Sequence, residues 1–236
     1  MAHILLVHGS NHGAWCWRDV LPALSRAGHA AEALDLPSVS HDPAALTHVT
    51  LDDDARAISA ALTGPTVLVG HSAAGFAITR AAQLAPDRIA ALVYLCAYVP
   101  RPGATVATLA RAAPGNPLQG ALEIDRTHRA YRFRDDALAR NLYDDCPDET
   151  RAYARQHLGW QATLAQSAAI DPPPADLPCH YVTCTRDRTI PPAQQAEMAA
   201  TLPQATRHEI ATGHSPFFAA PDRLAALLDA IARAPA

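Results

Sequence analysis

The 236-residue chain contains no lysine, so that all 19 of its basic side chains are arginines. Charged residues make up only 18% of the sequence, the formal net charge is −4, and the arginines form no basic tract. Proteins that bind nucleic acid carry a basic patch or stripe, which this chain lacks. The composition is that of an ordinary globular protein and argues against nucleic acid as a partner.

Cysteine and long apolar runs are also scarce. The five cysteines are odd in number and scattered, and a chain of this length needs no disulfides for stability. We therefore expect free thiols and a cytoplasmic location. The longest uncharged apolar stretch, residues 89–99, is shorter than the roughly 18 residues that cross a bilayer, and no signal-peptide pattern follows Met1. We expect no membrane segment.

Short aliphatic segments alternate with amphipathic ones along most of the chain. The last amphipathic segment follows Pro221 and places Leu224, Leu228 and Ile231 on one helical face. Another helix is expected to begin at Thr50, because the acidic residues 52–54 suit a first helical turn. Alternation of this kind predicts an α/β fold with a mostly parallel sheet of about six strands and helices on both faces. The strands are expected at residues 3–7, 30–35, 66–69, 89–97, 180–183 and 206–210.

The alternation breaks between residues 101 and 177, where proline, glycine and charged residues replace the aliphatic segments. We interpret this region as a small, mainly helical cap. It divides the core domain into a first part, residues 1–100, and a second part, residues 178–236.

A serine lies between the third expected strand and the following helix, in the sequence Gly-His-Ser-Ala-Ala-Gly of residues 70–75. In a nucleophile elbow, G-x-S-x-G, a tight strand-to-helix turn exposes the serine hydroxyl above the sheet. Ala74 replaces the second glycine here, and this looser pattern arises by chance about one time in ten. Its place after a central strand favours Ser72 as a nucleophile over an ordinary turn serine.

A serine hydroxyl needs a base to accept its proton and a carboxylate to orient that base. Among the twelve histidines, His214 lies in the loop between the last expected strand and the terminal helix. Asp187 follows the preceding expected strand, although an ion pair with a neighbouring arginine is an alternative explanation for it. The chain order Ser72, Asp187, His214 is that of α/β-hydrolases and differs from the orders of other serine-hydrolase folds.

Two backbone amides are candidates for an oxyanion hole. One is the amide of Ala73, directly after the nucleophile, and the other is the amide of Ser10 in the loop after the first strand. Gly9 in that loop allows a close approach of the backbone.

No metal or nucleotide cofactor is indicated. His8 and His12 are four residues apart, but the glycines beside them argue against a helix, and no His-Glu-x-x-His pattern exists. Cys179 and Cys184 should face opposite sides of one strand and so cannot share an ion. The glycine-rich motifs that bind phosphates are absent from the sequence.

The sequence Val-His-Gly-Ser-Asn-His-Gly-Ala-Trp-Cys-Trp of residues 7–17 resembles the opening of the plant methylesterase and hydroxynitrile lyase branch of the α/β-hydrolases. The resemblance continues through residues 70–75, Asp187 with residues 190–191, and residues 213–214. It implies a cofactor-free enzyme with a small cap over its site. Members of this branch act either on small carboxylic esters or on cyanohydrins.

Two positions distinguish these activities within the resembling branch. In the lyases a threonine follows the first histidine of the opening segment, and a lysine follows the catalytic histidine. The corresponding residues here are Gly9 and Ser215. Because the chain has no lysine to stabilise a departing cyanide, the esterase is favoured.

We therefore expect a cofactor-independent serine hydrolase that acts on a small-molecule ester through a catalytic triad and an acyl-enzyme. A hydroxynitrile lyase is the alternative, and a ligand-binding protein of low turnover is a third possibility. A homodimer through the cap or an edge strand is left open. The candidate substrate-binding residues are Gly9, His12, Trp160 and Phe217. Core packing explains the aromatic ones equally well.

Overall fold

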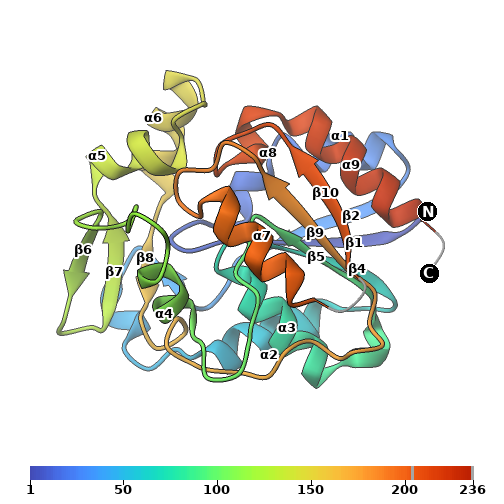
Figure 1. Ribbon diagram of the computed structural model, residues 1–236, viewed down its shortest axis with the longest axis horizontal. Coiled ribbons are helices and arrows are strands. Elements are labelled where there is room, and N and C mark those ends of the chain that lie inside the picture. The colour runs from blue at the N-terminus through green and yellow to red at the C-terminus, as the bar shows by residue number, and fades with distance from the viewer. Residues whose placement is uncertain (203–204, 235–236) are drawn as a thin grey trace.

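The structure is a computed structural model and describes residues 1–202 and 205–234. A six-stranded sheet in the order β10-β9-β5-β4-β1-β2 forms its centre, and every pair of neighbouring strands in it is parallel (Figure 1). The expectation of an α/β fold with a mostly parallel sheet of about six strands is confirmed. The strands are β1 His3–Val7, β2 Ala30–Leu34, β4 Thr66–His71, β5 Ile89–Leu95, β9 Cys179–Cys184 and β10 Thr206–Ile210.

The inner strands are apolar because both faces of the sheet are covered. Along β1, Leu5 and Val7 pack into the apolar cluster on one face, whereas Ile4 and Leu6 pack into the cluster on the other. Helices α2, α3 and α7 cover the first face, and α1 and α9 cover the second (Figure 1). The helices are α1 Leu21–Arg26, α2 Leu51–Ala61, α3 Ala74–Leu84, α7 Pro192–Ala200, α8 Pro216–Ala219 and α9 Pro221–Arg233, with short 3-10 turns η1 Ala14–Trp17, η2 Pro43–Leu46 and η3 Pro86–Arg88.

Local sequence signals explain where two of these helices begin. Thr50 is the N-cap of α2, and its backbone N–H donates to Asp53 Oδ2 at 2.9 Å to form a capping box. Pro221 opens α9, whose buried face includes Leu224 and Leu228, as the spacing predicted. Cys179 and Cys184 lie in different apolar clusters, on opposite faces of the sheet.

The cap region contains the expected short helices together with an antiparallel sheet that the sequence did not predict. The order of this sheet is β3-β8-β7-β6, and its first strand, β3 Val39–Ser40, comes from the first part of the core. Figure 1 shows these elements gathered at one end of the molecule. The cap elements are α4 Val106–Arg111, β6 Leu122–Asp125, β7 Ala130–Phe133, α5 Asp135–Ala137, the π-helix η4 Leu138–Leu142, α6 Asp148–His157 and β8 Trp160–Ala162.

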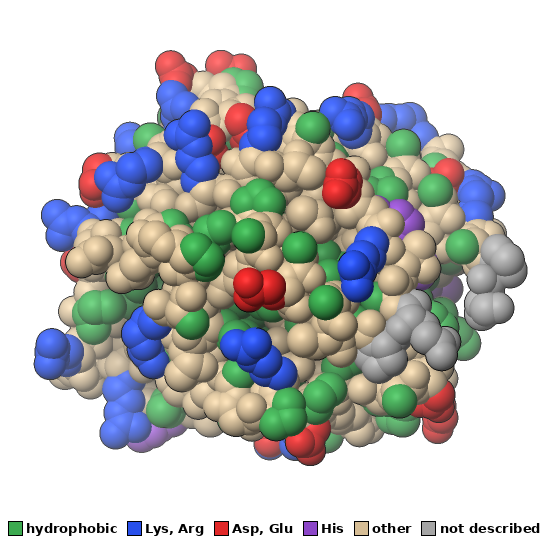
Figure 2. Space-filling model, in the orientation of Figure 1, with side chains coloured by type: hydrophobic (Ala, Val, Ile, Leu, Met, Phe, Trp, Pro, Cys, Tyr) green, Lys and Arg blue, Asp and Glu red, His purple; other side chains and the backbone are tan. Residues whose placement is uncertain are grey.

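The surface shows no concentration of positive charge on the face drawn in Figure 2, where arginines are spread among acidic, apolar and neutral groups. No helix within the described ranges is both long enough and apolar enough to cross a membrane.

The turn from β4 to α3 requires glycine at its closest contact. A Cβ atom built on Gly75, in the first turn of α3, would overlap the backbone carbonyl oxygen of Tyr98 in the loop that follows β5. The helix therefore approaches that loop as closely as the backbones allow.

We expect Gly75→Ala to lower the free energy of unfolding by about 1–3 kcal/mol, because the backbone must shift to admit the methyl group. Gly64→Ala is the matched control, since a Cβ there meets no atom within 4 Å. Urea unfolding of the two variants beside the wild type measures the difference. Equal stabilities for the two variants would contradict the close packing at Gly75.

Candidate active site

Ser72 lies at the tip of the turn between β4 and α3, with its backbone in the left-handed region at a φ of 55°. That conformation is costly for a residue with a Cβ and must be held by its surroundings. The amide of Ser72 donates to Leu95 O at 3.1 Å, and the amides of Gly75 and Tyr98 donate to Ser72 O at 3.2 and 3.0 Å. The chain forms this turn with Ala74 in place of the usual second glycine.

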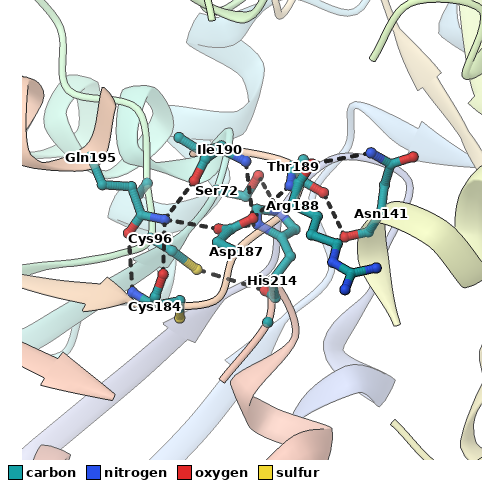
Figure 3. A network of polar contacts seen from close by, with 12 residues as sticks. Ser72, Cys96, Asn141, Cys184, Asp187, Arg188, Thr189, Ile190, Gln195 and His214 are labelled. Atoms are coloured by element: carbon teal, nitrogen blue, oxygen red, sulfur yellow. Dashed lines mark hydrogen bonds and ion pairs between the residues drawn. The ribbon is translucent and has the colours of Figure 1, made fainter. Parts of the chain in front are cut away.

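The structure brings Ser72, His214 and Asp187 together from three separate loops (Figure 3). His214 Nε2 lies 3.0 Å from Ser72 Oγ, and His214 Nδ1 lies 2.7 Å from Asp187 Oδ2. A carboxylate oxygen only accepts, so Nδ1 carries the proton and Nε2 is free to accept from the serine hydroxyl. The three residues are 7%, 1% and 4% exposed, respectively.

The Asp187 carboxylate is fixed by donors other than the histidine. Its Oδ1 accepts from the backbone amides of Thr189 and Ile190 at 2.7 and 2.9 Å, and its Oδ2 accepts from Gln195 Nε2 at 3.0 Å (Figure 3). Gln195 on α7 was not foreseen, because the sequence offers nothing to separate it from its neighbour Gln194.

The cap contacts both the loop that carries Asp187 and the loop that carries His214. The amide of Gly213 donates to Asp145 Oδ2 at 2.6 Å, directly before the histidine. Asn141 Nδ2 donates to Arg188 O at 3.1 Å, and Thr189 Oγ1 donates to Asn141 O at 2.9 Å. These cap residues lie in a segment without a recognisable motif, so the sequence could not single them out.

The loop after β1 lies against the serine. A Cβ on Gly9 would be only 2.8 Å from Ser72 Cβ, so glycine is needed for this approach. Ser10 lines the cavity beside Ser72, and its Oγ accepts a hydrogen bond from Tyr131 OH at 3.0 Å. In the described part of the chain, the amides of Ser10 and Ala73 donate to no protein acceptor.

Three buried histidines surround this loop in neutral form. His12 Nδ1 donates to Ser10 O at 2.8 Å, while Tyr143 OH donates to His12 Nε2 at 2.7 Å. Burial lowers the pKa of His12 to about 3, and it also lowers the pKa of His8 and His71. His71 Nε2 donates to the backbone oxygen of His214 at 2.8 Å. These rings act as hydrogen-bonding supports for the site.

The ring nitrogens of His8 and His12 are all used in hydrogen bonds within the protein. Both nitrogens of His8 are engaged, with Gly9 O and the amide of Leu36, and both nitrogens of His12 are engaged as above. Among the described residues, one group of potential ligands is His71, Cys96 and His214. The His214 nitrogens are already hydrogen-bonded to Ser72 and Asp187.

A cavity of about 310 Å³ opens onto Ser72 and His214. The cap supplies most of its wall, from α4, the β6–β7 hairpin and residues 163–167. Its apolar lining includes Val106, Ala110, Leu118, Leu122, Phe133 and Leu142.

Only one of the four candidate substrate-binding residues, His12, is part of this lining. Gly9 lies against Ser72 but is not among the lining residues. Phe217 is fully buried, with its ring centroid 5.2 Å from that of Trp17 and 5.0 Å from that of His71. Trp160 lies in the small sheet, and the guanidinium carbon of Arg132 lies over its ring, 4.6 Å from the ring centroid. The two aromatic residues therefore support the structure and do not line the cavity.

The sheet is parallel, a serine lies at a strand-to-helix elbow, and an acid and a histidine follow later strands. These features define an α/β-hydrolase with a Ser-His-Asp arrangement. The chain belongs to the alpha/beta hydrolase family, whose sequence pattern matches residues 4–227.

Relatives include a pyrethroid hydrolase of Sphingobium wenxiniae, which is 30% identical over an alignment of 251 positions that covers 99% of this chain and 88% of that protein. Methylesterase 1 of Arabidopsis thaliana is 28% identical, and the match covers 94% of this chain and 92% of the length of that protein. The match covers only 39–41% of the length of rice esterases. A crystal structure of the pyrethroid hydrolase PytH superimposes with a TM-score of 0.86 at 25% identity, covering 100% of this chain and 98% of that one. The resemblance to plant methylesterases is thereby confirmed.

The low pKa of His12 predicts how stability depends on pH. Between its ordinary pKa near 6.5 and its value of about 3 in the folded protein, the unfolded chain binds more protons, so stability falls as the pH is lowered. This histidine alone contributes about 1.4 kcal/mol per pH unit over that range. Asp54, whose pKa burial raises to about 7, acts in the opposite sense.

His12→Gln keeps a donor and an acceptor. Between pH 6 and 4 we expect this variant to take up about one proton fewer on unfolding than the wild type, so that its free energy of unfolding depends less steeply on pH. Exposed Gln119→Ala, which removes no titratable group, is the control and should retain the wild-type slope. Urea unfolding at several pH values measures both. An unchanged slope in His12→Gln would show that His12 is not held neutral by the fold.

Proposed function

We propose that this protein hydrolyses small carboxylic esters, with Ser72 as nucleophile, His214 as base and Asp187 as the residue that orients the base. The observation that carries the proposal is the buried, hydrogen-bonded chain from Ser72 through His214 to Asp187, which opens onto a largely apolar cavity. The names of the relatives, a methylesterase and a pyrethroid hydrolase, support the same chemistry.

In the first step Ser72 Oγ attacks the ester carbonyl carbon, while its proton passes to His214 Nε2. The Asp187 carboxylate stabilises the imidazolium that forms. The tetrahedral intermediate then expels the alcohol, which takes the proton from His214, and leaves an acyl group on Ser72. In the second step His214 removes a proton from water, and the resulting attack releases the acid and restores Ser72.

The oxyanion of each intermediate accepts hydrogen bonds from the amides of Ser10 and Ala73. Both amides are free of protein acceptors within the described residues, and Ala73 is the N-cap of α3, where the helix dipole favours negative charge. The hydrogen bond from His12 to Ser10 O holds the loop that presents the first donor. A hydroxynitrile lyase is not proposed, because Ser215 and Gly9 occupy the positions that distinguish the lyases.

The cellular setting that suits five free cysteines is a reducing one. All five cysteines are free and buried, and their thiols are not paired in the fold. We place the enzyme in the cytoplasm, acting on a small-molecule ester.

Ser72→Ala should lower kcat for p-nitrophenyl butyrate at least about a thousandfold, because the acyl-enzyme cannot form. Ser59→Ala is the matched control: this serine donates to Ala55 O within α2, away from the site, and its loss should leave kcat within about twofold. A serine-directed phosphonate should label the wild type and Ser59→Ala at residue 72. Hydrolysis that persists in Ser72→Ala, or a wild type that neither hydrolyses esters nor reacts with the phosphonate, would refute the mechanism.

Asp187→Asn should reduce kcat by roughly a thousandfold or more, because an amide group can donate to Nδ1 and so favour the wrong tautomer of His214. Asp145→Asn is the control, since the amide oxygen can still accept from the backbone of Gly213. Initial rates on the same ester compare the two. Similar losses in both variants would mean that loop position, and not the histidine tautomer, limits the rate.

A further inference from the structure

Gln166 belongs to the cavity wall, and its side chain has no hydrogen-bond partner among the described residues. Gln166 is only 8% exposed, lines the cavity, and buries its Oε1 without a donor. Its Nε2 also makes no hydrogen bond to any residue that the structure describes. Two neighbouring polar lining groups are satisfied by protein atoms: Thr163 Oγ1 donates to Arg129 O at 2.8 Å, and Ser167 Oγ donates to Thr163 O at 2.7 Å.

The backbone of Gln166 is held firmly on both sides. Its amide donates to Thr163 O at 3.1 Å, and its carbonyl oxygen accepts from the amide of Ala107, in α4, at 3.0 Å. The side chain therefore extends from an anchored segment of the cavity wall. The buried Oε1 without a donor costs free energy that hydrogen bonding to a ligand would recover.

The surroundings of Gln166 indicate the chemistry of that ligand. The rings of Tyr98, Tyr131 and Phe133 line the same cavity, together with aliphatic side chains. No carboxylate lies among the lining residues, and the one arginine, Arg111, is exposed. The wall therefore suits an uncharged apolar or aromatic group.

A hydroxyl is the simplest group that satisfies a carboxamide in either orientation, because it donates to the oxygen and accepts from the amino group. A carbonyl only accepts, and an ammonium group only donates. We propose that the substrate is an ester whose apolar body carries a hydroxyl, and that this hydroxyl hydrogen-bonds to Gln166 while the ester carbonyl lies at Ser72. The inference rests on the proposed ester hydrolysis and makes Gln166 a specificity-determining residue.

The test compares methyl 3-phenylpropanoate with its 2-, 3- and 4-hydroxyphenyl analogues, which move one hydroxyl around the same ring. For the wild type we expect kcat/KM to be about tenfold higher for at least one hydroxylated ester than for the parent. In Gln166→Met, which keeps the volume but removes the hydrogen bonds, this preference should fall to within about twofold. Gln166→Glu, which keeps an acceptor, should retain part of it.

Gln194→Met is the matched control. Gln194 is also buried with an unpartnered Oε1, but it lies outside the cavity lining and donates to Leu109 O at 2.8 Å. This variant should lose stability and keep the wild-type preference. It therefore separates recognition by Gln166 from a general effect of replacing a buried glutamine beneath α4.

Equal kcat/KM for all four esters in the wild type would overturn the inference while leaving ester hydrolysis intact, as would a preference that survives in Gln166→Met. Binding to Ser72→Ala, measured by calorimetry, gives a readout independent of turnover. The preferred hydroxylated ester should bind about tenfold more tightly than the parent, and adding Gln166→Met should remove the difference. If the wild type hydrolyses none of the esters, the proposed function is wrong. If Ser72→Ala then also binds the parent and the hydroxylated esters with equal affinity, the role of Gln166 is refuted as well.

Discussion

The left-handed backbone of Ser72 is the constraint on which the rest of the site depends. With φ at 55°, the residue departs from ordinary strand and helix geometry, and this lifts its side chain out of the sheet. The hydrogen bonds to Leu95 O and from the Tyr98 amide compensate for the strain, and they exist because β5 lies beside β4 in the sheet. Gly75 and Gly9 then allow the neighbouring backbones to approach this turn.

The cap completes the site and does not merely cover it. Asn141 and Asp145 hold the loops that carry Asp187 and His214, while Tyr131 and Tyr143 contact Ser10 and His12 in the loop after β1. A substitution in the cap can therefore alter the catalytic geometry as well as the choice of substrate. The core and the cap are also joined by the small sheet, in which β3 pairs with β8.

Burial shapes the electrostatics around the serine. His12 and His71 are too deeply buried to charge near neutral pH, since desolvation lowers the pKa of each. They hold neighbouring backbone groups as neutral rings, whereas His214 has its two nitrogens directed at Ser72 and Asp187. In the proposed mechanism His214 transfers the proton, and its buried neighbours support the surrounding backbone.

The sheet strands, the elbow and the order of Ser72, Asp187 and His214 could be predicted from the amino-acid sequence, because apolar periodicity and motif spacing are local properties of the chain. Only the tertiary structure placed these three side chains within hydrogen-bond distance and identified Gln195 as a further partner of Asp187. The structure also shows that Phe217 and Trp160 do not line the cavity, which the sequence could not reveal because their packing partners come from other segments. The short strands of the cap were missed because their pairing with residues 39–40 is a long-range contact that no local pattern records.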